Sequence, residues 1–194
     1  MLREPGGRAG FLFFCATRRK RLYPMSEKRI LVLGVGNVLL KDEGVGVKVI
    51  ETLGSEYAFS SNVELMDGGT LGLRLLDPIC DADFLIVVDA VLNGGTPGTL
   101  YRLPVSEIEK RVTFKNSLHQ LDLVETLAYA EILGRRPDAV IIGVEPEDIS
   151  PWGLEMTDVV KAAFREICSK VLEEIERAGG SFRRINPDDL SSVK

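Results

Sequence analysis

The sequence predicts an α/β fold in three layers: a mostly parallel, twisted five-stranded sheet with one antiparallel strand, and helices on both faces. Two observations lead to this fold class. Short apolar runs alternate with amphipathic stretches, as expected when parallel strands are buried between two helical layers. One apolar run follows its predecessor after a glycine-rich turn that is too short for a helical crossover, which predicts one antiparallel strand.

The composition narrows the possible function classes. The chain has 194 residues, 45% of them hydrophobic, enough for one domain with a full core. A formal net charge of −5 argues against a general nucleic-acid binder, because phosphate binding needs a basic face. No apolar run approaches the ~20 residues of a membrane span, so no membrane partner is expected. Three cysteines without a CxxC pair fit the reducing cytoplasm.

Both ends of the chain differ from the middle. Residues 1–28 are basic at first and are expected to be a disordered extension, or residues upstream of a true start at Met25. Residues 29–178 carry the strand and helix patterns and are expected to form the single α/β domain. Residues 179–194 are polar, so we expect a frayed C-terminal tail.

The first unit of the domain is a strand, a tight turn and a helix. Residues 30–33 form a continuous apolar run, and Gly34 and Gly36 follow as the turn. Asp42 is expected to cap a helix that starts at Glu43. The predicted apolar face of that helix consists of Val45, Val47, Val49, Ile50 and Leu53.

The middle of the domain contains three more strands. Residues 63–66 and 84–88 are predicted strands. Residues 71–76 are expected to form a short helix that is broken before Pro78. Residues 99–103 follow the 84–88 strand closely and are expected to run antiparallel to it.

The C-terminal part of the domain supplies a strand between two helices. A capping-box pattern at 117–120 starts a helix that is expected to end at Gly134. Residues 139–144 form the fifth predicted strand. The last helix is expected to start at Thr157 or Asp158. Its predicted inner side consists of Val159, Val160, Ala163, Phe164, Ile167, Val171 and Ile175.

Acidic residues follow the predicted strands. Glu43 lies in the first turn, and Asp67, Asp89 and Glu145 come directly after later strands. Ligands of parallel sheets bind at the carboxyl ends of the strands, so this edge is the predicted functional site. Structural interpretations remain open: acids favour the first turn of a helix, Asp67 can brace its Gly-Gly turn, and Asp42 can serve only as a cap.

The glycine turn does not predict a nucleotide site. The dinucleotide pattern GxGxxG would need glycine at position 39, which is Leu39. The acidic pair Asp42 and Glu43 would also repel a pyrophosphate. We therefore interpret the glycines as structural and expect no cofactor-binding residues of this kind.

His119 is the only histidine of the chain. Near the amino end of a helix, the helix dipole disfavours the imidazolium form, and a neutral imidazole is what a metal ligand or a proton acceptor needs. Together with Glu43 and Asp89 it would give a nitrogen and oxygen site for zinc, nickel or another divalent ion, with positions left for water or substrate.

Five blocks of the sequence occur in a recognisable order: LVLGVGNVLLKDEGVGVKVIETL, MDGGTLGLRLL, LIVVDAV, SLHQLDLVETL and IIGVEPEDISPWGLEMTDVV. Together they resemble the NiFe-hydrogenase maturation endopeptidases over residues 29–176. The resemblance implies a cytoplasmic hydrolase that removes a C-terminal extension from the precursor of the hydrogenase large subunit after nickel has entered it. The peptidase would be aspartyl-type or metal-dependent.

The resemblance also implies roles for individual residues. Glu43, Asp89 and His119 would be both catalytic residues and ligands of the nickel in the precursor, for which zinc or cadmium could substitute in vitro. Asp42 and Asp67 would be supporting residues. Two alternatives remain: a non-catalytic metal-sensing maturation chaperone, and a metallopeptidase that acts on another substrate. An ordinary zincin is not expected, since no HExxH motif is present.

Overall fold

The computed structural model describes residues 27–70, 72–104, 107 and 118–186. Its main sheet has the strand order β3-β1-β4-β6-β5, in which β5 is antiparallel to β6 and the other neighbours are parallel. This confirms the predicted sheet with one antiparallel strand. The strands are β1 (Ile30–Val35), β3 (Val63–Gly69), β4 (Phe84–Ala90), β5 (Leu100–Pro104) and β6 (Asp138–Val144).

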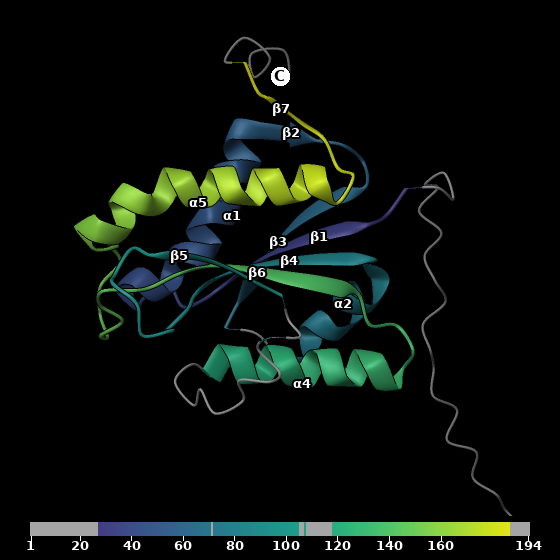
Figure 1. Cartoon of the computed structure of the whole chain (residues 1–194), viewed down its shortest axis with the longest axis horizontal. Coiled ribbons are helices and arrows are strands. Elements are labelled where there is room, and N and C mark those ends of the chain that lie inside the picture. The colour runs from purple at the N-terminus through teal and green to yellow at the C-terminus, as the bar shows by residue number, and fades with distance from the viewer. Residues whose placement is uncertain (1–26, 71, 105–106, 108–117, 187–194) are drawn as a thin grey trace, which may run out of the picture.

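Helices cover both faces of the sheet, as predicted (Figure 1). One face carries α1 (Val45–Glu56) and α5 (Asp158–Arg177). The other carries α2 (Leu76–Asp81) and α4 (Leu118–Ile132). Successive side chains of a strand point to opposite faces, so each buried strand contributes to two apolar clusters, one under each helical layer. Within the part of the chain described, no helix is long and apolar enough to span a membrane.

Two glycines let the segment after β1 fold back closely onto the sheet. A Cβ atom at Gly34 would lie 2.3 Å from the carbonyl oxygen of Gly46, and one at Gly36 would lie 1.7 Å from that of Glu43. Gly36 also has a φ of +132°, which L side chains rarely adopt. Both positions therefore require glycine, in agreement with their structural interpretation.

The start of the first helix differs from the prediction. A 3₁₀ helix, η1 (Lys41–Gly44), precedes α1, whose N-cap is Gly44. Asp42 is therefore not the N-cap, and it makes no capping hydrogen bond to this helix. The reason is that its carboxylate accepts hydrogen bonds from a distant loop instead. The predicted apolar face of α1 is buried at all five positions.

Pro78 does not break the short helix before it, which corrects a second prediction. A 3₁₀ turn, η2 (Leu73–Leu75), leads into α2, and Pro78 is the third residue of α2. The first N–H groups of a helix have no partner within it, so proline there costs no hydrogen bond. The helix instead ends at Asp81.

The antiparallel strand β5 lies at one edge of the sheet, beside β6. β5 pairs with β6, in register from Leu100 opposite Val144 to Pro104 opposite Val140. It cannot pair with β4, because β1 and β6 already occupy the two edges of β4. β5 therefore runs antiparallel to β4, as predicted, with β6 between the two strands.

Part of the C-terminal tail is ordered, contrary to the prediction of a frayed end. β7 (Phe182–Arg184) pairs in the antiparallel direction with β2 (Tyr57–Phe59). The aromatic rings of Tyr57 and Phe182 meet edge to face at 5.5 Å, and Phe59 lies 6.2 Å from Phe182. Aromatic residues within a polar tail thus supply the apolar contact that holds it. Residues 187–194 and the predicted extension at 1–26 lie outside the described residues.

The remaining helices agree well with their patterns. α5 begins at Asp158, one of the two predicted starts, and the side chain of its N-cap Thr157 accepts a hydrogen bond from the backbone of Val160. Val159 was predicted on the inner side of α5 but is 39% exposed. Neighbouring residues of a helix point in different directions around its axis, and here Val160 is the one that faces the core. α4 ends at Ile132, just before Gly134 with its φ of +65°, whereas the capping residue Ser117 lies outside the described residues.

Candidate functional site

The acids of the sequence analysis gather at one end of the molecule. The parallel strands β1, β4 and β6 end there, and α4 begins at the same end (Figure 1). η1 packs against β4 beside these strand ends. The topology therefore brings elements from four distant parts of the chain to one edge, where parallel sheets bind their ligands.

Asp89 is a buried acid of this edge, and the backbone N–H of Ala90 is the donor that acts on its carboxylate. It is the second-last residue of β4 and is 3% exposed. Its Oδ1 atom is buried and accepts no hydrogen bond from the residues the structure describes. Burial, and secondarily the charge of Glu43, raises the pKa of Asp89 well above its ordinary value. Such a carboxylate favours a proton or a cation at this position.

Glu43 lies in η1 and is half-buried. Its backbone carbonyl rests against Gly36, which fixes the segment over the end of β1. Its charge contributes to the raised pKa of Asp89, so the two carboxylates lie close enough to interact. The structure therefore brings together two of the three residues that were predicted to form the site.

His119 lies in the first turn of α4, at the end of the molecule where β4 and β6 end (Figure 1). Its side chain is not among those described, so its convergence on Glu43 and Asp89 stays a prediction. The helix itself is fixed by Leu123 and Leu127, which are buried against the sheet. Among the described residues, no group of three or more histidine, cysteine or acidic side chains is arranged to hold a metal ion.

Asp42, next to Glu43, holds a loop in place. It is fully buried, and its Oδ2 accepts hydrogen bonds from the backbone of Glu147 at 2.9 Å and of Asp148 at 3.0 Å. The backbone and the hydroxyl of Thr157 donate to its two oxygens at 2.7 Å and 3.0 Å. All four donors are used to anchor residues 147–157 against η1, which gives Asp42 a supporting role without contact to a substrate.

Asp67 is exposed on the turn that ends β3. Its Oδ1 accepts a hydrogen bond from the backbone of Gly69 at 2.8 Å. Gly69, with a φ of +50°, in turn accepts a hydrogen bond from the backbone of Gly36. The interpretation of Asp67 as a brace of its own turn agrees with this geometry.

Glu145, which directly follows β6, is an anion held by backbone amides. The N–H groups of Asn93, Gly94 and Gly95 donate to it at 3.0–3.2 Å, and the Tyr101 hydroxyl donates at 2.7 Å. Burial alone would raise the pKa of Glu145, but these donors outweigh that effect and lower it. The sequence signal for this role is the glycine pair, which lets successive amides point to one anion.

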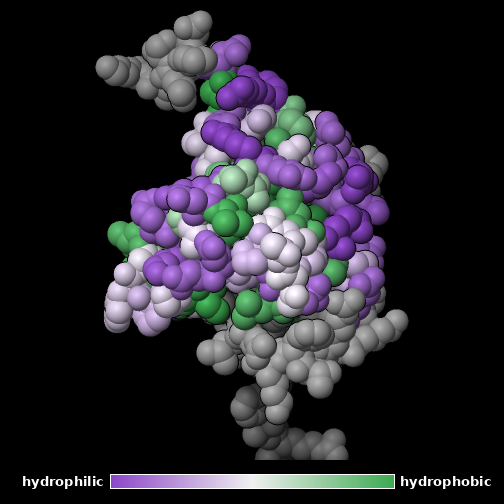
Figure 2. Space-filling view, turned by 60° about the vertical axis from the view of Figure 1, so that its left-hand side comes forward, coloured by the Kyte–Doolittle hydropathy of each residue, from purple (hydrophilic) through white to green (hydrophobic). Residues whose placement is uncertain are grey.

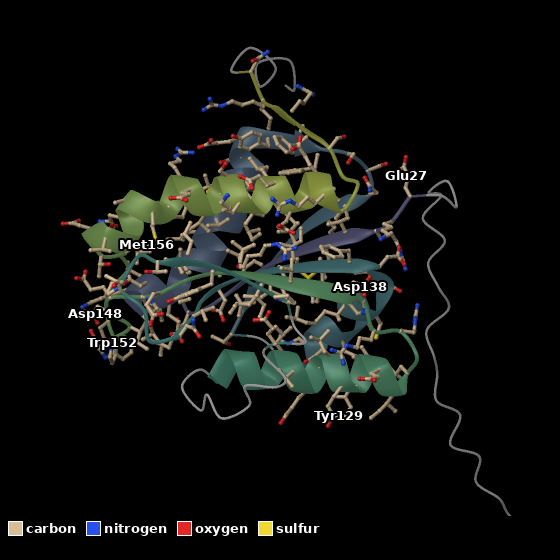
Figure 3. All side chains as sticks on the ribbon, in the orientation of Figure 1. Glu27, Tyr129, Asp138, Asp148, Trp152 and Met156 are labelled. Carbon is tan, nitrogen blue, oxygen red and sulfur yellow. The ribbon has the colours of Figure 1, made fainter. Side chains whose placement is uncertain are left out.

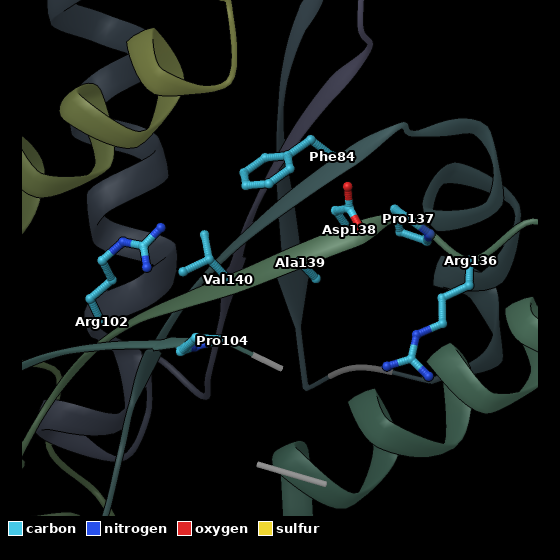
Figure 4. Close-up of a pocket in the computed structure, with 8 residues that line it drawn as sticks. All are labelled: Phe84, Arg102, Pro104, Arg136, Pro137, Asp138, Ala139 and Val140. Carbon is cyan, nitrogen blue, oxygen red and sulfur yellow. The ribbon is translucent and has the colours of Figure 1, made fainter. Parts of the chain in front are cut away.

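The described structure also has a cavity at the opposite end of the sheet. Its volume is about 390 Å³, and it lies at the amino ends of β4 and β6 (Figure 4). Arg102 lines it, but its guanidinium already forms a bidentate pair with Glu174 at 2.7 Å and 3.0 Å. We therefore assign the functional site to the carboxyl ends of the strands, where the paired carboxylates lie.

Comparison with known proteins points to one family. The model of a family described as hydrogenase maturation protease matches residues 47–174. The hydrogenase expression/formation protein HupD of Thiocapsa roseopersicina is 40% identical over 86% of this chain and 76% of its own length. The hydrogenase 2 maturation protease of Escherichia coli is 38% identical over 78% of this chain and 93% of its own.

A solved structure agrees with these relatives. The hydrogenase maturating endopeptidase HybD from E. coli superposes with a TM-score of 0.77 and 36% sequence identity. The match covers 83% of this chain and 99% of that one. The residues that the family model matches include the end of β4 with Asp89 and begin after Glu43.

Proposed function

The chain belongs to the hydrogenase maturation protease family, and from that premise we propose that it removes the C-terminal extension of a NiFe-hydrogenase large-subunit precursor once nickel has been inserted. The precursor is then both substrate and partner, and the cytoplasm is the compartment where it would be met. Endopeptidase activity accords with the family; the nickel requirement and the cleavage point are the proposed part.

The observation that carries this proposal is the pairing of the buried Asp89 with the half-buried Glu43. A buried carboxylate oxygen that accepts no hydrogen bond from the described residues costs free energy, and a divalent cation would remove that cost. The charge of Glu43 and the raised pKa of Asp89 fit the same explanation. These residues therefore suit nickel presented by the precursor, and zinc or cadmium in its place.

In the proposed mechanism, Glu43, Asp89 and His119 bind the metal and take part in proton transfer. Glu43, Asp89 and the imidazole of His119 would hold the metal, so a precursor without nickel would bind less well. A bound divalent metal supplies a Lewis acid for the peptide carbonyl or for water. Glu43 or Asp89 would act as the base that accepts a proton from the attacking water and returns it to the amine of the leaving peptide. The surrounding apolar strands exclude bulk water from Asp89.

The decisive experiment incubates the purified chain with nickel-loaded and with nickel-free precursor and measures both masses. We expect loss of the C-terminal peptide only when nickel is present. His119→Ala and Glu43→Gln should leave the precursor intact while circular dichroism stays unchanged. Asp138→Asn is the matched control, because Asp138 is an exposed carboxylate at the opposite end of the sheet (Figure 3).

Each other outcome has a definite meaning. Cleavage of both precursors would remove the nickel requirement from the proposal. Normal processing by the Glu43 and His119 variants would remove the assigned site. No cleavage of either precursor, together with tight binding of the nickel-loaded one, would replace the protease by a metal-sensing maturation chaperone.

A further inference from the structure

Two segments beside Glu43 form a platform, which consists of residues 37–41 and 148–154. The backbone N–H of Lys41 donates to the carbonyl of Gly153 at 2.7 Å, and those of Trp152 and Gly153 both donate to the carbonyl of Leu39 at 3.1 Å. Leu40 and Gly153 also form a parallel bridge. More than a hundred residues of sequence separate the two segments, yet they are bonded as neighbouring strands would be.

The platform holds an unusual backbone. Lys41 has a φ of +53° and Trp152 a φ of +71°, and within the part of the chain described no other non-glycine residue has a positive φ. Such conformations persist only where the surroundings enforce them, and they concentrate at functional sites. The surroundings here are the buried carboxylate of Asp42 below and an ion pair between Lys41 and Asp148.

The platform also exposes large apolar side chains. Trp152 is 87% exposed and Leu39 is 44% exposed. Val38, Ile149 and Leu154 are further exposed hydrophobic residues of the same two segments. Figure 2 shows this end of the molecule, where hydrophobic side chains gather among hydrophilic ones, and Figure 3 places Trp152 beside Asp148. Exposed apolar surface of this kind marks interaction sites.

We propose that this platform docks the large-subunit precursor, and that Trp152 is inserted into an apolar surface of the precursor next to its C-terminal extension. The inference rests on the proposed function and adds the surface that recognises the substrate. The argument for this occupant is continuity: Leu39 and Lys41 lie four and two residues before Glu43 in one short segment. A partner seated on the platform therefore lies next to Glu43.

The physical design favours a tight and specific contact. Tryptophan is the side chain most enriched at the energetic centres of interfaces. Because the hydrogen bonds to Asp42 and between the two segments already fix the backbone, little conformational entropy is left to lose on binding. Asp42 thereby acts as a positioning residue for the platform.

The first test uses the fact that Trp152 is the only tryptophan of the chain. The full chain is labelled with 5-fluorotryptophan and gives one fluorine resonance, and unlabelled nickel-loaded precursor is then added. We expect this resonance to shift and to lose its difference between H₂O and D₂O, since the indole leaves water. An unchanged resonance in a mixture that still forms the complex would overturn the inference.

The second test measures cleavage kinetics with Trp152→Asn and Leu39→Ala. Asparagine tolerates a positive φ, so Trp152→Asn keeps the backbone of the platform. We expect KM for the precursor to rise about thirtyfold for Trp152→Asn, as for an interface hot spot, with kcat changed less than about threefold. Ile132→Ala is the control, because Ile132 is 80% exposed at the far end of α4.

The outcomes separate this inference from the proposed function. An unchanged KM in both platform variants, with normal cleavage by the unmodified chain, would overturn the docking surface and keep the protease. Failure of the unmodified chain to cleave any precursor would overturn the proposed function and the inference with it. A dimer of the free chain that Trp152→Asn dissociates in sedimentation velocity would show that a second copy occupies the platform, and would also overturn it.

Discussion

Asp89 and Glu145 belong to neighbouring strand ends and are almost equally buried, at 3% and 4% exposure, yet their environments are opposite. Glu145 receives four hydrogen bonds, and its pKa is lowered. Asp89 has a buried oxygen that accepts none among the described residues, and its pKa is raised. Burial alone thus does not identify a functional acid; the number of donors around it does.

The adjacent acids Asp42 and Glu43 also differ in what their carboxylates act on. Asp42 receives four hydrogen bonds from residues 147–157 and so fastens a loop. Glu43 instead acts on Asp89 through its charge. In this site, each proposed catalytic acid lies next to an acid that stabilises a loop: Asp89 beside Glu145, and Glu43 beside Asp42. The predictions below remove one member of each type at a time.

The largest effect is expected for Asp89→Asn. Loss of the charge should lower precursor processing about a thousandfold, the range for a lost general base. The free energy of unfolding should stay the same or increase, because an amide is cheaper to bury than a carboxylate whose Oδ1 accepts no hydrogen bond from the described residues. Single-turnover cleavage and urea unfolding of the same preparation measure the two quantities. A clear loss of stability would place Asp89 with the anchoring acids.

Asp42→Ala should have the opposite profile. Four donors, three of them backbone N–H groups, would lose their acceptor, which should lower the free energy of unfolding by about 3–5 kcal/mol. Urea unfolding followed by circular dichroism measures the change. A loss below about 1 kcal/mol would mean that water replaces the carboxylate, which a buried position disfavours.

Glu145→Gln should be less destabilising, by about 1–2 kcal/mol, because the amide keeps one acceptor oxygen. The pH dependence of this stability difference tests the role of Glu145 more specifically than its size does. The pKa of Glu145 is lower in the folded state, so its stabilisation is present above the unfolded pKa and is lost as pH falls through the folded one. The stability difference between the unmodified chain and Glu145→Gln should therefore shrink in acid.

Asp89 should show the reverse trend in the same titration. Its pKa is higher in the folded state, so ionisation destabilises the fold as pH rises from the unfolded pKa through the folded one. The advantage of Asp89→Asn should therefore grow toward neutral pH and vanish in acid. Parallel pH profiles for the Asp89 and Glu145 variants would contradict the proposed difference between the two acids.

The sequence predicted the five-stranded sheet because buried strands and amphipathic helices leave local periodic patterns. It also placed Glu43 and Asp89 at one edge, since parallel strands end together. It could not separate the anchoring acids from the others, because the donors to Asp42 lie more than a hundred residues away in sequence. The tail strand β7 was missed for the same reason: its partner β2 is equally distant.

The smallest effect is expected for Asp67→Asn. Asp67 is exposed and accepts one hydrogen bond, from the next-but-one backbone amide, which an asparagine side chain can also accept. The free energy of unfolding should therefore change by less than about 0.5 kcal/mol, and processing of the precursor by less than about twofold. Urea unfolding and the cleavage assay measure both. A large loss of processing at unchanged stability would instead show that Asp67 acts with Glu43 and Asp89 on the substrate. The number of hydrogen-bond donors around an acid would then not distinguish the acids that stabilise the fold from those that act on the substrate.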